Sequence, residues 1–450
     1  MDQKPLFKQF LHYCIPTVLS LWVFSLYMMV DGLFVARGVG EMALSAVNLC
    51  MPFMQLLFAV AILFAVGTST VCAILSGQQK QQQANRLFSQ NTVLLLVAGI
   101  AVMALVLCCM DQIILFLGAT PETAAYMREY MTGIVPFCIS IMVSYSLEIL
   151  VKTDGFPRLA MIAVTVGALL NCALDYLFVF VFHLGVFGAA VATGISQTVV
   201  MLVYIIHFLK KRGKFRFCRF RFNFRVYRRI IPIGVSDSLT ELSVGVAVFL
   251  FNRAILQFIG VEGIVTYTII SYIGNIVIMT MAGISQGMQP LVSYAHGCGD
   301  EKKHRQLLKY AVRSVLFVSV CAFLICLAFA KPVTAAFIPN GDRVLVEYSI
   351  WALRIYSISF LLAGFNIVAG GYLTALERPK SAIVISLSRS IVLLALSLFV
   401  LTLLFGGQGI WWTMTVTETL TLVLSIWLLR RETKKEPHKT KRLGYAHLSE

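Results

Sequence analysis

Residues 170–176, Leu-Asn-Cys-Ala-Leu-Asp-Tyr, place an amide (Asn171) and a carboxylate (Asp175) inside an otherwise apolar stretch that runs from about 160 to 182. A stretch of this length can cross a membrane as a helix, which takes about 20 apolar residues. Residues four apart leave the same face of a helix, one turn apart. An ionisable group inside such a span is costly, so Asn171 and Asp175 mark a candidate functional site.

The rest of the chain is equally apolar. Of its 450 residues, 59% are hydrophobic and 13% are charged, whereas soluble domains are about 45–50% apolar. This composition excludes a soluble globular protein and predicts an all-α polytopic membrane protein with about twelve transmembrane helices. We place the spans near residues 14–36, 43–75, 92–110, 130–151, 160–182, 187–209, 231–258, 264–294, 310–330, 350–374, 381–404 and 409–429.

The net charge of +16 comes mainly from alternate connections between the predicted spans. This asymmetry follows the positive-inside rule and predicts that both termini are cytoplasmic. The connection 210–229 has ten Lys or Arg residues with Phe interleaved. Basic and aromatic alternation can bind nucleic acid, but its place between two spans favours anionic membrane lipid as the partner over nucleic acid.

The sequence pattern restarts after this connection. Ile231-Pro232 repeats Ile15-Pro16, and the interval from Gly287 to Gly297 repeats that from Gly67 to Gly77. Because each half has an even number of spans, we expect two six-helix lobes related by a pseudo-two-fold axis along the membrane normal. The predicted divisions are an amino-terminal lobe (1–209), a basic cytoplasmic linker (210–229), a carboxy-terminal lobe (230–430) and a basic cytoplasmic tail (431–450).

Four polar residues of the first half should lie at one depth. At the helical rise of about 1.5 Å per residue, Asp31, Asp175 and Thr193 lie roughly 8–10 Å below the outer boundary. Together with Asn171 they offer oxygen ligands suited to Na⁺, and a close pair of carboxylates could load and release a proton near neutral pH. A lone Asp31 could instead reach the outer interface. No Cys or His spacing indicates another metal site.

Other buried acids have two interpretations each. Glu148, near the cytoplasmic end of its span, could pair with a neighbouring base or take part in function. Glu241 and Glu418 are the acids deepest in apolar surroundings in the second half. Either could be functional, or could be a buried acid satisfied by Arg389 or by an amide.

The whole chain resembles the MATE (multidrug and toxic compound extrusion) family, and within it the MepA-like bacterial branch. The resemblance rests on Ile15-Pro16, Met29-Val30-Asp31-Gly32, Thr153-x-Gly155-x-Pro157, Asn171-x3-Asp175, Gly188-Ala189-Ala190-x-Ala192-Thr193 and Gly287-x-Gln289-Pro290. It implies two six-helix lobes around a central cavity of alternating access. It also implies export of diverse, often cationic compounds against inward flow of H⁺ or Na⁺.

The resemblance also implies roles for particular residues. Asp31, Asn171, Asp175 and Thr193 match the amino-lobe cation site, and Pro16 matches a bend in the first helix. Candidates for coupling or substrate binding are Tyr27, Glu148, Glu241, Gln289 and Glu418. Some members of the family have a second acid in the tenth span, but residues 361–371 hold Asn366 and no carboxylate. A two-acid Na⁺ site in the carboxy-terminal lobe is therefore not expected.

The leading hypothesis is a monomeric, cation-coupled antiporter of the bacterial cytoplasmic membrane. It would export amphipathic or cationic drugs by alternating access, with H⁺ or Na⁺ as coupling ion and no other cofactor. A flippase for a lipid-linked precursor is the main alternative, although about twelve spans and few basic residues within the first half argue against it. An intramembrane enzyme is disfavoured because no HExxH, GxSxG or GxxxxGK motif occurs. The buried acids argue against a purely structural membrane protein.

Overall fold

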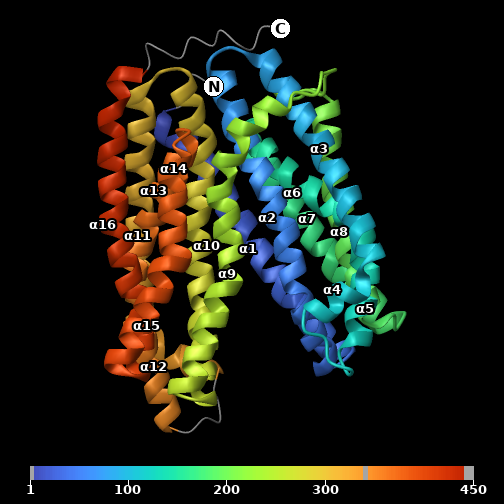
Figure 1. Ribbon diagram of the computed structural model, residues 1–450, viewed down its shortest axis with the longest axis vertical. Helices are drawn as coiled ribbons and strands as arrows, with labels where there is room; N and C mark the ends of the chain where they lie inside the picture. Colours follow the sequence, from blue (N-terminus) through green and yellow to red (C-terminus); the bar gives the residue numbers. More distant parts are fainter. Residues whose placement is uncertain (1–4, 338–342, 440–450) are drawn as a thin grey trace.

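The computed structural model of the protein describes residues 5–337 and 343–439 (Figure 1). Within this part of the chain, twelve helical segments are long and apolar enough to cross a membrane, which confirms the predicted number of spans. The first six segments comprise α1 (Leu6–Gly38), α2 (Glu41–Gly77), α3 (Gln81–Cys108), α5 (Ala124–Ile134), α6 (Cys138–Thr153), α7 (Pro157–Asp175) and α8 (Gly185–Leu209), and the short α4 (Met110–Phe116) lies in the connection between the third and fourth segments. The other six comprise α9 (Tyr227–Phe258), α10 (Val261–Gly297), α11 (Glu301–Phe337), α12 (Arg343–Ser357), α13 (Phe360–Ala375), α14 (Pro379–Leu387), α15 (Leu393–Phe405) and α16 (Gly407–Lys439).

Several of these spans are interrupted by short turns of other helical types. The 3-10 turn Val135–Phe137 separates α5 from α6, and it contains Pro136, which has no backbone N–H to continue an α-helix. Wider π-helical turns follow α7, at Tyr176–Val181, and α14, at Ser388–Val392. Both π-helical turns lie beside polar groups that are described below.

The helices form two lobes, which confirms the predicted architecture, and each lobe has its own hydrophobic core. The first turns of α1 and of α9 each pack in the hydrophobic core of the opposite lobe. Tyr227, Ile230 and Ile233 of α9 belong to the amino-terminal core, and Phe10, Tyr13 and Cys14 of α1 belong to the carboxy-terminal core. Each lobe therefore stabilises one helix of the other.

Glycines bring the two lobes together at two equivalent places. A side chain at Gly67 of α2 would collide with the main chain of Ile230, and one at Gly287 of α10 would lie 2.7 Å from Cys14 Cα. Cys14 and Ile230 each precede the Ile-Pro pair of their half. The repeated sequence pattern thus corresponds to repeated backbone contacts, which small residues allow.

The lobes are not in contact along their full length. Figure 1 shows their ribbons side by side at the end where both termini lie, and diverging towards the opposite end. The main contacts between the lobes are made by α1 and α2 with α9 and α10. The predicted linker 210–229 is non-helical up to a 3-10 turn at Phe224–Val226, and its last residues open α9. The predicted tail begins within α16, and residues 440–450 lie outside the described part of the chain.

Candidate functional site

Two acids meet where α1 packs along α7. Asp175 is the last residue of α7 before the π-helical turn, a kind of irregularity that often lies at functional sites. Asp31 of α1 is 7% exposed and Asp175 is fully buried. The two carboxyl groups are near enough to interact with each other. The structure thus brings these two predicted residues together.

The acids have no counter-charge from the described part of the protein. Neither forms an ion pair with a described residue, and both oxygens of Asp175 and Oδ1 of Asp31 have no hydrogen-bond donor. A buried carboxylate without a donor or a cation is unfavourable. The pair is therefore suited to bind a proton or a small cation, which would relieve that cost.

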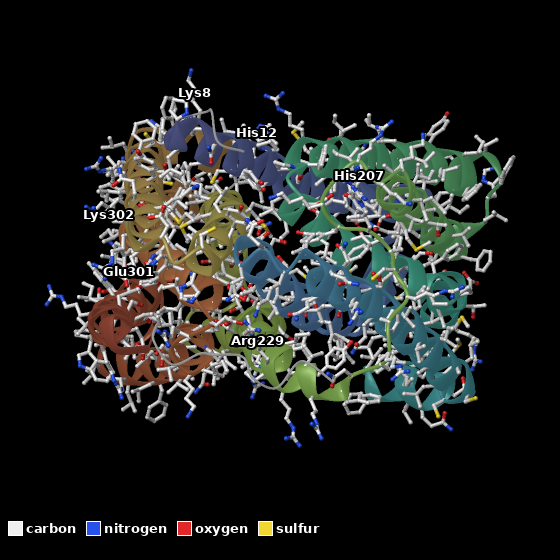
Figure 2. All side chains as sticks on the ribbon, turned by 90° about the horizontal axis from the view of Figure 1, so that it is seen from above. Lys8, His12, His207, Arg229, Glu301 and Lys302 are labelled. Atoms are coloured by element: carbon white, nitrogen blue, oxygen red, sulfur yellow. The ribbon has the colours of Figure 1, made fainter. Side chains whose placement is uncertain are left out.

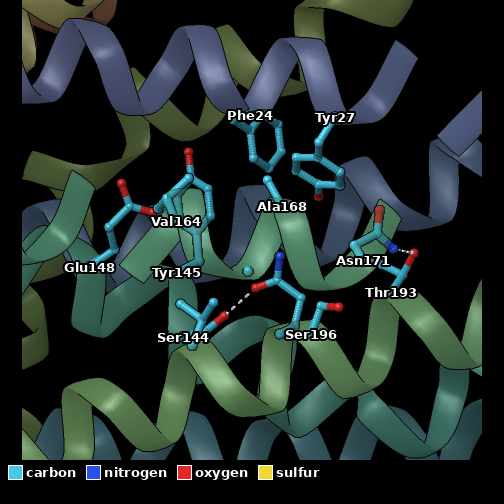
Figure 3. Close-up of a pocket in the computed structure, with 13 residues that line it drawn as sticks. Phe24, Tyr27, Ser144, Tyr145, Glu148, Val164, Ala168, Asn171, Thr193 and Ser196 are labelled. Atoms are coloured by element: carbon cyan, nitrogen blue, oxygen red, sulfur yellow. Dashed lines mark hydrogen bonds between the residues drawn. The ribbon is translucent and has the colours of Figure 1, made fainter. Parts of the chain in front are cut away.

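The predicted amide and hydroxyl complete the site from α7 and α8. Asn171 lies one turn before Asp175, and its Nδ2 donates to Thr193 Oγ1 at 3.2 Å (Figure 3). Because the amide nitrogen of Asn171 is bonded to Thr193, its Oδ1 is the atom left to act as a ligand; this oxygen is buried and accepts no hydrogen bond. The four residues thus offer several oxygen ligands, the type that Na⁺ prefers. The described residues contain no group of three or more His, Cys, Asp or Glu side chains that could hold a metal ion.

A pocket adjoins this site and extends between α1, α6, α7 and α8 (Figure 3). Its lining includes Asn171 and Thr193 together with Phe24, Tyr27, Ser144, Tyr145, Glu148, Ser196 and Gln197. Ser144 Oγ donates to Gln197 Oε1 at 2.8 Å. Neither Ser144 nor Gln197 was predicted from the sequence. Gln197 was detectable, because it follows Thr193 by four residues and so shares its face of α8.

Glu148 reaches the pocket but already has a cation beside it. Lys152 Nζ lies 2.6 Å from Glu148 Oε1, and the two residues are one turn apart on α6. Both side chains are largely buried. This is the pairing with a neighbouring base that the sequence allowed as one interpretation, and it distinguishes Glu148 from Asp31 and Asp175.

The remaining candidates lie outside this pocket. Glu241 is half-buried on α9, and Gln289 of α10 packs against Gly371 of α13. Pro16 lies inside α1, two residues after the contact of Cys14 with α10. The bend at Pro16 remains a prediction.

Glu418 on α16 is held by a cation and an amide of its own lobe. Arg389 Nε donates to Glu418 Oε1 at 2.7 Å, and Asn366 Nδ2 donates to Oε2 at 2.7 Å. Arg389 stands in the π-helical turn Ser388–Val392. The geometry thus corresponds to the alternative interpretation of Glu418, a buried acid satisfied by Arg389 and an amide.

The family model described as MatE matches residues 16–177 and 238–400 of this chain, well over half of its length. The chain belongs to the MatE family. The two matched segments fall one in each lobe, which agrees with the internal repeat. The first segment contains Asp31, Asn171 and Asp175, whereas Thr193 and Glu418 lie outside both segments.

Among proteins similar to this MatE-family chain are two called multidrug export protein MepA, from Staphylococcus aureus (strain bovine RF122 / ET3-1) and from Staphylococcus saprophyticus. Each is 24% identical over 434 residues, which cover 95% of both chains. A solved multidrug resistance MATE transporter of the MOP superfamily, in an outward-facing conformation, matches with a TM-score of 0.90 and 22% identity. The match covers 96% of this chain and 97% of that one. A MOP superfamily transporter from Pyrococcus furiosus matches with the same coverage, a TM-score of 0.88 and 22% identity.

Proposed function

We propose that this protein exports diverse amphipathic or cationic compounds in exchange for H⁺ or Na⁺, by alternating access. The observation that supports the proposal most strongly is the buried pair Asp31 and Asp175, which has no counter-charge among the described residues. The names of the MepA relatives support the substrate class, because they are multidrug export proteins. The protein would act as a transporter rather than as an enzyme.

Coupling would follow from the position of α1 in both lobes. The half of α1 that holds Asp31 packs on α7, and the half that holds Cys14 belongs to the carboxy-terminal core. A cation that binds between Asp31 and Asp175 would change the packing of α1 on α7, and with it the contact between the lobes. Such a cation shifts the equilibrium between two conformations only as far as it binds one of them more tightly.

Orientation follows from the distribution of charge. With the basic connections in the cytoplasm, both termini would be cytoplasmic, and the end where the lobes are in contact would face the cytoplasm. The lobes would then diverge towards the outside. The membrane would be the cytoplasmic membrane of a bacterium, since the MepA relatives come from bacteria of the genus Staphylococcus. We expect a monomer, because each lobe already packs against the other within one chain.

The decisive experiment is transport of a fluorescent lipophilic cation in vesicles that contain the purified full chain, with the Na⁺ and pH gradients imposed separately. Asp175→Asn should lower gradient-driven efflux about tenfold or more, within the usual range of coupling free energies of about 1–3 kcal/mol. Asp111→Asn is the matched control, because Asp111 is an exposed acid that pairs with Arg128 on the surface. The wild-type response to each gradient identifies the coupling ion.

Two results would contradict the proposal. Efflux by Asp175→Asn that still follows the imposed gradient would exclude the acid pair as the coupling site. Wild-type efflux that responds to neither gradient would exclude cation coupling itself.

A further inference from the structure

We propose that residues 210–226, the basic linker, bind the headgroups of anionic lipids in the membrane leaflet that surrounds this end of the protein. The linker joins α8 to α9 and so connects the two lobes. Figure 2, viewed from the end where the termini lie, shows it running over the surface of the amino-terminal lobe between His207 and Arg229. The proposal is independent of the exported compound and of the coupling ion.

One side of the basic linker is fixed to the amino-terminal lobe through its backbone. The backbone N–H groups of Lys214 and Phe215 donate to Asp154 Oδ1 at 2.6 and 2.8 Å, and the side chain of Asp154 is fully buried. Cys218 N–H donates to Ser89 Oγ on α3 at 3.0 Å. These bonds give the segment a defined path, so its other side chains are presented in a fixed arrangement.

The same path leaves the charges of the basic linker facing outwards. Eight Lys or Arg side chains of the segment, and Arg228 just after it, are exposed, and none of them has a carboxylate partner among the described residues; the eight are Lys210, Lys211, Arg212, Lys214, Arg216, Arg219, Arg221 and Arg225. Arg229 differs, because it makes a two-point ion pair with Glu377 at 2.6 and 2.8 Å. The structure therefore neutralises Arg229 at the lobe contact and leaves a large positive surface beside it.

The phenylalanines of the basic linker divide into two groups. Phe215 and Phe217 pack around Phe88 of α3, with ring centroids 5.9 and 4.9 Å from it. Phe222 and Phe224, in contrast, are 40% and 73% exposed. Exposed aromatic rings beside arginines are typical of the headgroup layer of a membrane, where a ring buries its apolar part and the cations remain with phosphate.

The position of the segment distinguishes lipid from nucleic acid. Both ligands offer phosphate, and both can accept exposed aromatic rings. The basic linker, however, starts directly after α8, whose last turns expose Ile206 and Leu209 at 48% and 60%. Such exposed apolar side chains on a membrane-spanning helix indicate contact with lipid, so phosphate headgroups lie within reach of the neighbouring arginines. We therefore assign the surface to anionic lipid.

The test measures lipid binding directly on the purified full chain in detergent. Phosphatidylglycerol, phosphatidylcholine and a single-stranded 20-nucleotide RNA are titrated separately, and retained ligand is counted by native mass spectrometry. Each basic residue near an anionic surface contributes about 1 kcal/mol, or roughly a fivefold change in affinity. The double variant Arg219→Gln/Arg221→Gln should therefore bind phosphatidylglycerol about tenfold more weakly or worse, with phosphatidylcholine binding unchanged.

Two further variants make the test specific. Lys302→Gln/Lys309→Gln removes the same charge from exposed positions on α11 and should change phosphatidylglycerol binding much less. Phe222→Ser/Phe224→Ser removes the exposed rings without a change of charge and should weaken binding a few-fold. Equal loss in the linker and α11 variants, equal binding of both lipids by the wild type, or tighter binding of the RNA than of phosphatidylglycerol would each overturn the proposal.

Discussion

In the amino-terminal lobe, Asp31 and Asp175 are buried without an ion-pair partner in the described part of the chain, whereas Glu418 in the carboxy-terminal lobe is buried against Arg389 and Asn366. A π-helical turn lies at each arrangement: Tyr176–Val181 directly follows Asp175, and Ser388–Val392 contains Arg389. The difference lies in the cation. A fixed arginine occupies, beside Glu418, the position that a mobile cation would need, and no such group stands beside Asp31 and Asp175. The comparison predicts that one lobe uses its acids for ion binding and the other for stability.

The largest effect should come from breaking the carboxy-terminal arrangement. Glu418→Gln leaves the Arg389 guanidinium largely buried without its carboxylate, which should cost about 3 kcal/mol or more of unfolding free energy. The measurement is denaturant unfolding of the protein in detergent. Arg389→Gln/Glu418→Gln removes both charges and should recover much of that loss. A Glu418→Gln variant as stable as wild type would mean that Arg389 does not depend on this carboxylate.

Substitution of the glycines at the contacts between the lobes should, in contrast, lower the unfolding free energy by a similar amount in both halves. Gly67→Ala and Gly287→Ala each place a methyl group against the backbone of the other lobe, and each should cost about 1–3 kcal/mol of unfolding free energy. Gly32→Ala is the control, because a methyl group there meets only Leu44 Cδ1, at 3.7 Å. A clear loss in one variant alone would show that the repeated contacts are not equivalent in energy.

A smaller effect is expected within the cation site. Asn171→Ala removes the hydrogen bond to Thr193 and should cost about 1 kcal/mol of unfolding free energy. It should also weaken cation binding, because the amide oxygen is lost. A double-mutant cycle with Thr193→Ala measures the hydrogen bond itself. Additive losses of unfolding free energy in the two single variants would show that the two side chains do not interact.

The smallest effect on stability should come from the acid pair. Asp31→Asn and Asp175→Asn each remove a buried charge that has no fixed partner, so the unfolding free energy should change by less than about 1 kcal/mol or should rise. Measured beside Glu418→Gln in the same detergent, these variants test the comparison directly. Destabilisation by Asp175→Asn as large as that by Glu418→Gln would remove the distinction between the two lobes.

Much of the site was predictable because its signals are local. Asn171 and Asp175 are four residues apart in one apolar span, and helical rise alone put Asp31 and Thr193 at a similar depth. In the structure Asn171 donates a hydrogen bond to Thr193, and Asp31 and Asp175 are near enough to interact with each other. The role of Glu418, functional or structural, could not be decided from the sequence. Its partner Arg389 is 29 residues away, and helical spacing does not determine which face of one helix meets another.

The twelve spans, the two repeated halves and the polar positions inside them could be predicted from the sequence alone. They depend on apolar length and on helical periodicity, which are properties of one segment at a time. Three other features depend on how the helices pack: α1 and α9 each enter the core of the other lobe, Arg389 neutralises Glu418, and Phe215 is buried while Phe224 is exposed. Those outcomes depend on which helix faces pack together. Side chains from distant segments make that choice jointly, through the close packing that each contact allows.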